Sequence, residues 1–275
     1  MLQALATIIG GKGFIGSHLH TKLLACGWDC HTPDRQAIYD NKKDMGHVFY
    51  CAGLTADYIQ RPFDAVEAHV SLLSRILQNC AFQSLTYLSS TRLYDSQPGT
   101  IASEDMPLLL NPGNSRHIYD LSKALGESLC LVMGKGRARV ARLSCVYNDH
   151  TDTDGFLPDL LQHIIIKRPS LLKIDTSPHY KRDYIHLQDV LEALILIATK
   201  GNNLIYNVAS GENISNEILF STLTKISGCK IQALSHDTPT IPCKIDISRM
   251  QNEFNWHPVS VLKKITAILK EITEC

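Results

Sequence analysis

The sequence has no excess of charge of either sign, since its 275 residues include 27 Lys+Arg and 27 Asp+Glu. A nucleic-acid-binding surface needs clustered positive charge, so nothing here favours a nucleic-acid partner. The apolar runs, Val190–Thr199 among them, are too short or too interrupted to span a membrane. The first residues lack the charged start and the small-residue cleavage site of a signal peptide. We therefore expect a cytoplasmic protein that binds neither nucleic acid nor membrane.

Metal-binding spacings are also missing. The nine cysteines are irregularly placed, and no pair of CxxC spacings or His spacing is typical of a metal site. Several cysteines lie inside apolar runs, which favours buried, reduced thiols in a reducing compartment. Cys26 and Cys30 could alternatively form a redox pair. We expect no metal.

The sequence does have an alternation of buried strands and helices. Continuous apolar runs predict strands that are buried on both faces of a parallel sheet. Apolar residues spaced by three and four predict the intervening helices. The expected strands are 4–9, 28–32, 48–52, 84–89, 139–146 and 204–208, and the expected helices are 17–26, 64–79, 117–133, 157–166 and 190–199.

This alternation is typical of a doubly wound α/β fold. We expect residues 1–148 and 182–210 to form the sheet domain. Residues 149–181 and 211–275 are expected to form a smaller C-terminal lobe over the carboxyl edge of the sheet, where such folds bind their ligands.

A glycine turn follows the first predicted strand. Gly10, Gly13 and Gly16 permit a tight turn, close approach of the backbone to a pyrophosphate, and close packing of helix on strand. Phe14 and Ile15 would then open a helix whose N-terminus favours anions. The turn predicts a dinucleotide site, and the alternative is a flexible glycine turn without a ligand.

Asp34 ends the second predicted strand. A carboxylate there can accept hydrogen bonds from the adenosine ribose hydroxyls and repel a 2′-phosphate, which favours NAD. Lys12 and Arg35 are basic neighbours that could hold a 2′-phosphate, so NADP stays possible. Asp34 and Arg35 could also form only a solvated turn.

Tyr119 and Lys123 lie four residues apart, on one face of a predicted helix. A free tyrosine is a poor base at neutral pH, with a pKa of ~10. An adjacent ammonium and an oxidised nicotinamide would favour the phenolate. Lys123 could also bind the nicotinamide ribose. Residues 87–94 run from a strand into a loop at the ligand edge, and a hydroxyl there could hydrogen-bond the reacting oxygen together with Tyr119.

With these motifs in place, the chain resembles the extended short-chain dehydrogenase/reductases, in particular the NAD-dependent epimerase/dehydratase family, over nearly its whole length. The resemblance implies a Rossmann-type sheet domain and a nucleotide-sugar substrate. It rests on the glycine turn, Asp34-Arg35, Cys51-Ala52-Gly53, Ser89-Ser90, Tyr94, Glu104, Tyr119-x-x-x-Lys123 with Glu127, Arg142-Leu143, Val146-Tyr147, Arg182 to His186, Asp189-Val190, Tyr206-Asn207-Val208, Ser210-Gly211 and Trp256-x-Pro258.

The resemblance also implies roles for particular residues. Ser90 would be the catalytic hydroxyl, Tyr119 the acid and base, and Lys123 the cation that binds the cofactor. Cys51, Ala52 and Gly53 would line the cofactor site, and Arg182 would face the diphosphate of the substrate. From the residues alone, Arg182 and Asp183 are equally readable as a surface ion pair, and His186 as a packed histidine.

Several positions depart from the family pattern. Dehydratases of the family have an Asp-Glu pair where this chain has Thr91, a substrate-contact position, and Arg92, so 4,6-dehydration is not expected. The family usually has Asn where this chain has His69 and Cys145. Twelve residues between Arg35 and Val48 leave no room for a crossover helix and another full strand, which predicts a trimmed sheet edge and an open adenine pocket.

We therefore expect an NAD(P)-dependent oxidoreductase that acts on a nucleotide-activated sugar, as an epimerase or a 4-ketoreductase. The alternative is a non-catalytic dinucleotide-binding protein, such as a redox sensor or assembly factor. The resemblance further implies a homodimer formed through the helices at 64–79 and 117–133.

Overall fold

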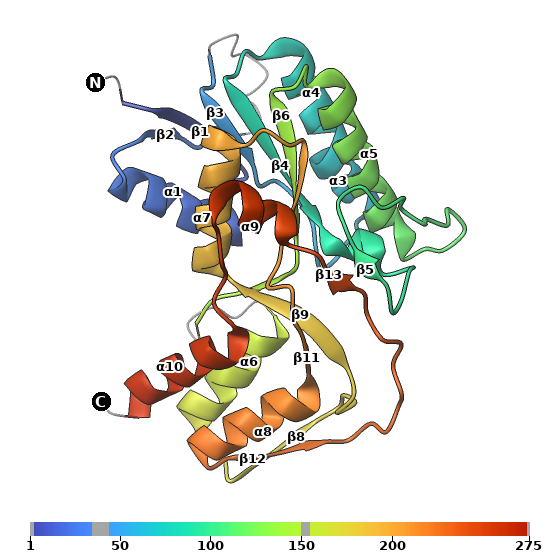
Figure 1. Ribbon diagram of the computed structural model, residues 1–275, viewed down its shortest axis with the longest axis vertical. Helices are drawn as coiled ribbons and strands as arrows, with labels where there is room; N and C mark the ends of the chain where they lie inside the picture. Colours follow the sequence, from blue (N-terminus) through green and yellow to red (C-terminus); the bar gives the residue numbers. More distant parts are fainter. Residues whose placement is uncertain (1–2, 35–43, 150–154, 274–275) are drawn as a thin grey trace.

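The computed structural model describes residues 3–34, 44–149 and 155–273. The predictions for Arg35 and for most of the shortened segment after it therefore lie outside the described residues. The described chain forms a sheet layered with helices and, next to it, a smaller body of helices and short strands (Figure 1).

A parallel sheet forms the centre of the larger body, and its strands have the order β10-β6-β4-β3-β1-β2. Within the described residues β2 is an edge strand beside β1, as expected for a trimmed sheet. Most side chains of β1, β3, β4, β6 and β10 are buried, because helices cover both faces. The strand bounds are β1 Leu5–Ile9, β2 Asp29–His31, β3 His47–Tyr50, β4 Ser84–Ser90, β6 Ala138–Leu143 and β10 Ile205–Val208.

Helices cover the two faces of this sheet in separate layers. The helices α1 (Phe14–Ala25) and α7 (Leu187–Lys200) pack on one face, where Leu19 and Leu194 belong to the core. The other face carries α5 (His117–Met133) and a helical segment that runs from residue 62 to residue 79. This segment consists of α3 Pro62–Val66, a π-helical turn Glu67–Ser71 and α4 Leu72–Asn79.

Gly126 allows α5 to lie very close to the sheet. A Cβ atom at this position would overlap the Tyr87 hydroxyl and would lie 2.8 Å from the carbonyl oxygen of His69. Only glycine leaves room for this approach, which brings the catalytic-helix residues predicted from the sequence up against β4.

The prediction of one strand over 139–146 is wrong. The strand β6 ends at Leu143, opposite Ser90 and Val208, where its neighbours β4 and β10 also end. No strand of the large sheet is therefore left to pair with the residues beyond. The chain continues as β7 (Cys145–Tyr147), which pairs with β9 (Lys181–His186) in a separate sheet of order β11-β9-β7.

The smaller body packs around its own core, which includes Leu161, Tyr184 and Leu223. Met250 and Trp256, which the sequence-based division assigns to this lobe, pack instead in the core of the large sheet. The elements of the smaller body include α6 Phe156–Gln162 with the π-helical turn His163–Lys167, β8 Leu171–Ile174, β11 Asn213–Ser215, α8 Asn216–Ser227, β12 Lys230–Ala233 and α10 Val261–Thr273. The remaining elements are the strand pair β5 Ile101–Ala102 and β13 Lys244–Ile245, and the helix α9 Ser248–Phe254.

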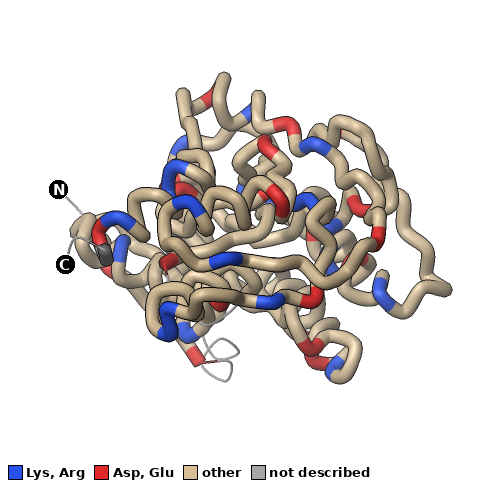
Figure 2. The backbone as a smooth tube through the Cα atoms, turned by 90° about the horizontal axis from the view of Figure 1, so that it is seen from below, with Lys and Arg blue, Asp and Glu red and all other residues tan. Residues whose placement is uncertain are grey.

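Charged residues of both signs are mixed along the chain (Figure 2), and the cysteines in the described ranges form no disulfide. Figure 2 shows basic and acidic residues interspersed along the chain in that view. The eight cysteines in the described ranges, Cys26 and Cys30 included, are free thiols. Among the described residues no helix is both long and apolar enough to cross a bilayer. The same residues contain no cluster of three or more His, Cys, Asp or Glu that could hold a metal ion.

Candidate active site

The carboxyl ends of the parallel strands bring the predicted site residues to one edge of the sheet. The strand β1 leads into the glycine turn, β3 leads into Cys51-Ala52-Gly53, and β4 ends at Ser90. A short 3-10 helix, Thr91–Tyr94, follows Ser90 directly. The Ser90 hydroxyl oxygen accepts a hydrogen bond from the Arg92 backbone amide at 3.2 Å, which fixes how the chain turns away from the sheet.

Tyr119 and Lys123 point from α5 toward this edge. Tyr119 is 3% exposed, and the Ser90 hydroxyl is close enough to the phenol to oppose the rise of its pKa. The Lys123 Nζ atom donates to the carbonyl oxygen of Leu88 at 2.8 Å, and it lies 6.0 Å from the centre of the Tyr119 ring. The structure thus brings together the three residues predicted to be catalytic.

The electrostatics of Tyr119 differ from the sequence-based expectation. Burial raises the pKa of Tyr119 above its ordinary value, and the strongest opposing effect is the Arg92 guanidinium, followed by the hydrogen bond with Ser90. We expected Lys123 to supply the positive charge. Burial instead lowers the pKa of Lys123 to about 7, so its ammonium is partly deprotonated at neutral pH.

His69 holds the catalytic helix in place from the π-helical turn. Its ring is fully buried, and its Nε2 atom accepts a hydrogen bond from the Leu54 amide at 3.1 Å. The Nδ1 atom therefore carries the proton and donates to the Ser122 Oγ at 2.8 Å, and Ser122 in turn donates to the carbonyl oxygen of Tyr119. Burial lowers the pKa of His69 to about 2, so the ring is neutral.

Glycine at positions 10 and 53 lets the chain segments at this edge of the sheet approach closely. A Cβ atom at Gly10 would lie 2.7 Å from the Ala52 amide nitrogen, and one at Gly53 would lie 3.3 Å from the Lys123 Nζ. Gly13 stands at the N-terminus of α1 with no capping side chain, and the first turn carries no acidic residue. The backbone amides there are suited to an anion, so these residues fit a pyrophosphate group.

The second strand was expected to end at Asp34, but β2 ends at His31, and Asp34 lies three residues beyond it. Its carboxylate pairs with the Lys12 Nζ at 3.0 Å, and both side chains are mostly exposed. Phe14 and Ile15, in the first turn of α1, are partly buried and pack against the core of the sheet.

A buried ion pair between Arg142 and Glu127 stabilises the elements that carry the site. The Arg142 guanidinium binds both carboxylate oxygens of Glu127, with an Nη2–Oε2 distance of 2.6 Å, and both side chains are 4% exposed. Arg142 also donates to the Tyr94 hydroxyl at 2.6 Å, and Tyr94 donates to Asn207 Oδ1. This network links α5 to the sheet and to the helical turn that carries Arg92.

Arg182 is exposed on β9 and does not pair with its neighbour Asp183. Its guanidinium lies over the Tyr180 ring, donates to the Tyr180 hydroxyl, and approaches the Cys145 Sγ at 3.8 Å. Asp183 instead accepts hydrogen bonds from the backbone amides of Ser210 and Gly211. The alternative of a surface ion pair between Arg182 and Asp183 is therefore wrong.

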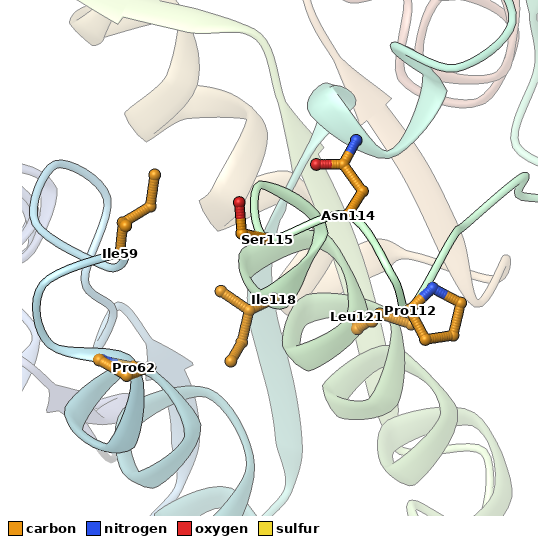
Figure 3. A pocket seen from close by; sticks show the side chains of 7 residues that line it. All are labelled: Ile59, Pro62, Pro112, Asn114, Ser115, Ile118 and Leu121. Carbon is orange, nitrogen blue, oxygen red and sulfur yellow. The ribbon is translucent and has the colours of Figure 1, made fainter.

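His186 caps α7 and packs against Tyr147, as a packed histidine would. A separate apolar hollow of about 310 Å³ lies beside the beginning of α5. Its lining side chains come from the beginning of α3 and the loop before it, from the segment that leads into α5, and from the first turns of α5, and none of the predicted catalytic residues is among them (Figure 3). They are Ile59, Pro62, Pro112, Asn114, Ser115, Ile118 and Leu121.

Comparison with known proteins identifies the class. The model of the NAD dependent epimerase/dehydratase family matches residues 6–209, and the chain belongs to this family. It is similar to UDP-glucose 4-epimerase 4 of Oryza sativa subsp. japonica, with 23% identity over 90% of this chain and 84% of that protein.

Two solved structures have the same fold. MoeE5 in complex with UDP-glucose and NAD superimposes with a TM-score of 0.78, at 21% identity over 98% of both chains. RMD from Pseudomonas aeruginosa, complexed with NADPH, superimposes with a TM-score of 0.76, at 22% identity over 100% of this chain and 99% of that one. These proteins confirm the Rossmann-type sheet.

Sequence reasoning missed the residues that surround the Tyr119 ring. Tyr58, from the loop before α3, lies with its ring centre 5.3 Å from that of Tyr119, and Arg92 lies against both rings. Asp120, next to Tyr119 in sequence, faces Arg92. The sequence signal that could have pointed to Arg92 is its departure from the family pattern, since it stands where the dehydratases have an acidic residue.

Proposed function

We propose that the protein is an NAD-dependent enzyme that transfers a proton and a hydride at a carbinol carbon of a nucleotide-activated sugar. The observation that carries the proposal is the geometry of Ser90, Tyr119 and Lys123 at the end of β4, on the same edge of the sheet at which β1 leads into the glycine turn. Family membership supports the cofactor, and the nucleotide sugars bound by similar proteins support the substrate class.

Each residue has a defined task in this proposal. Ser90 and Tyr119 hold the reacting sugar oxygen, and Tyr119 takes up the hydroxyl proton when the sugar is oxidised or returns it when a keto sugar is reduced. Lys123 would bind the nicotinamide ribose, and the glycine turn would bind the pyrophosphate. NAD supplies the hydride acceptor or donor when it is bound.

We propose epimerase or 4-ketoreductase chemistry rather than 4,6-dehydration. Elimination of water needs an acid and a base besides Tyr119, and Thr91 and Arg92 stand at the family positions that would supply them. A guanidinium stays protonated near neutral pH and is a very weak acid, so Arg92 is suited to neither role. Arg182, which is exposed beside Cys145, is proposed to bind the diphosphate of the substrate.

The test is turnover of a panel of nucleotide sugars and their 4-keto forms by the purified protein. NMR would follow isomer formation, and absorbance would follow reduced cofactor. Isomer formation without net cofactor reduction would assign an epimerase, and consumption of NADH or NADPH with a keto sugar would assign a reductase. Cofactor binding without turnover of any member would refute the proposal and favour a non-catalytic dinucleotide-binding protein.

We further propose that the protein forms a homodimer through the outer surfaces of α5 and of the helical segment that includes residues 64–79. Large apolar side chains are exposed there, with Phe63 88% exposed and Val132 73% exposed. Large apolar side chains that are left exposed along these helices are suited to a contact between two copies of the chain. Sedimentation at micromolar concentration should give twice the mass of one chain, and a Val132→Asp variant should sediment as a monomer. A single-chain mass for the unmodified protein would contradict the dimer.

A further inference from the structure

The Arg92 guanidinium is held between two tyrosine rings at the candidate active site. Its central carbon lies 4.4 Å from the ring centre of Tyr119 and 5.0 Å from that of Tyr58. Its Nη2 atom donates to the Tyr58 hydroxyl at 3.0 Å. A guanidinium over an aromatic face is attracted to the ring electrons, so these contacts fix the cation on the Tyr119 ring.

The charge of Arg92 is only loosely neutralised. Its nearest carboxylate is Asp120, with a distance of 3.8 Å between Arg92 Nε and Asp120 Oδ1. Both atoms are buried, and within the described residues neither has a hydrogen-bond partner. A close, hydrogen-bonded carboxylate would cancel the field of the guanidinium at the phenol, and this pair does so only in part.

Several other charged or polar groups face Tyr119 from the elements packed against it. Ser90 on β4 favours the phenolate, and Asp120 and Tyr58 disfavour it. The neutral His69 ring lies edge-on at 5.3 Å between ring centres. The Lys123 Nζ is farther from the ring centre than Arg92 is, at 6.0 Å. Since Lys123 loses its charge near neutral pH and a guanidinium does not, Arg92 is the permanent cation beside the phenol.

We propose that Arg92 is a positioning residue that acts through Tyr119: it lies on the ring, favours the phenolate, and thereby sets the pH above which Tyr119 can accept a proton. The inference rests on the proposed function only in that Tyr119 is the proton carrier. It assigns to Arg92 a part of the task that we expected Lys123 and an oxidised nicotinamide to perform.

The test measures the ionisation of the residue at position 119 without any need for turnover. Difluorotyrosine is introduced in place of Tyr119, because its phenol ionises nearer neutrality, and the fluorine NMR signal is followed against pH. Arg92→Met should raise the midpoint by about 1 to 3 pH units, which is the usual effect of an opposite charge at 4 to 6 Å. Arg92→Lys should raise it less, because the charge stays.

Two controls keep the result interpretable. Arg116→Met removes a nearby guanidinium that pairs with Asp95 at 2.9 Å, and it should move the midpoint by no more than a few tenths of a unit. Asp120→Asn should lower the midpoint. Adding Arg92→Met to the Asp120→Asn variant should raise the midpoint again. The double variant leaves no buried charge unpaired, so it can replace the single Arg92→Met variant if that variant folds poorly.

A midpoint in the double variant equal to that of Asp120→Asn would overturn the inference, whether or not the enzyme turns over nucleotide sugars. A raised midpoint with no turnover would support the role of Arg92 and refute only the proposed function. Once an active substrate is known, the pH midpoint of kcat/KM should move to higher pH in Arg92→Met, by the same amount as the midpoint measured by NMR.

Discussion

Replacing Glu127 with glutamine should lower the free energy of unfolding by about 3 to 5 kcal/mol, the usual effect of removing one partner of a buried ion pair. Glutamine has nearly the same shape as glutamate, so the change removes charge and leaves no cavity. The Arg142 guanidinium, 4% exposed, would then keep its charge with no carboxylate at 2.6 Å to balance it. The Tyr94 hydroxyl, which accepts from Arg142, cannot supply that charge.

Urea denaturation followed by circular dichroism measures this loss directly. At about 2 to 4 °C per kcal/mol for a chain of this size, the Tm should fall by roughly 6 to 20 °C. The Glu127 carboxylate also raises the pKa of Lys123, so the variant should bring that pKa below about 7. Cofactor affinity should therefore decline together with stability.

Two comparisons separate a buried charge effect from a general loss of packing. Glu67→Gln breaks a partly exposed pair with Arg75 and should cost no more than about 1 kcal/mol. Combining Glu127→Gln with Arg142→Met should restore part of the lost stability, since no buried charge is left unpaired. A loss below about 1 kcal/mol for Glu127→Gln, or a double variant weaker than the single one, would refute the reasoning.

Three further changes test other parts of the structure. Gly126→Ala should cost about 1 to 3 kcal/mol in urea denaturation, because its methyl group overlaps the Tyr87 hydroxyl, and an unchanged stability would contradict the close packing of α5. His69 is neutral in the folded protein, with a pKa of about 2, and takes up a proton below 6.5 when unfolded, so stability should fall on acidification. The loss from His69 between pH 7 and pH 5 should be about 2 kcal/mol and should be absent in His69→Asn, and equal pH slopes in the two proteins would contradict this. Asp34→Ser should leave stability within about 0.5 kcal/mol, because the side chain is mostly exposed, and should raise the affinity for NADPH relative to NADH in fluorescence titrations, a ratio that stays fixed if Asp34 does not contact the ribose.

The larger elements could be predicted from local sequence signals. The buried run before Gly10 is a strand of a parallel sheet, and the helix expected over 117–133 occupies those residues. Each depends on a periodicity that a single segment carries. The break after Leu143 could not be found in this way, because it is set by where the neighbouring strands β4 and β10 end.

The candidate site also combines residues that the sequence predicts with contacts that it does not. Ser90, Tyr119 and Lys123 could be proposed as site residues because the sequence shows the four-residue spacing of Tyr119 and Lys123 and the position of Ser90 at the end of a strand. The contact between Arg92 and the rings of Tyr58 and Tyr119 joins residues far apart in the chain, and spacing says nothing about which of them meet. The pKa directions of Tyr119 and Lys123 depend on burial by such distant groups, so spacing could not predict them.

The central claim is that Tyr119 transfers the proton in a redox reaction on a nucleotide sugar. The most direct measurement compares the unmodified protein with Tyr119→Phe on the nucleotide sugar that it turns over, at equal cofactor saturation. The account predicts a kcat lower by about 10² to 10⁴-fold in the variant, with cofactor affinity and Tm nearly unchanged. Turnover by Tyr119→Phe at the rate of the unmodified protein would contradict it.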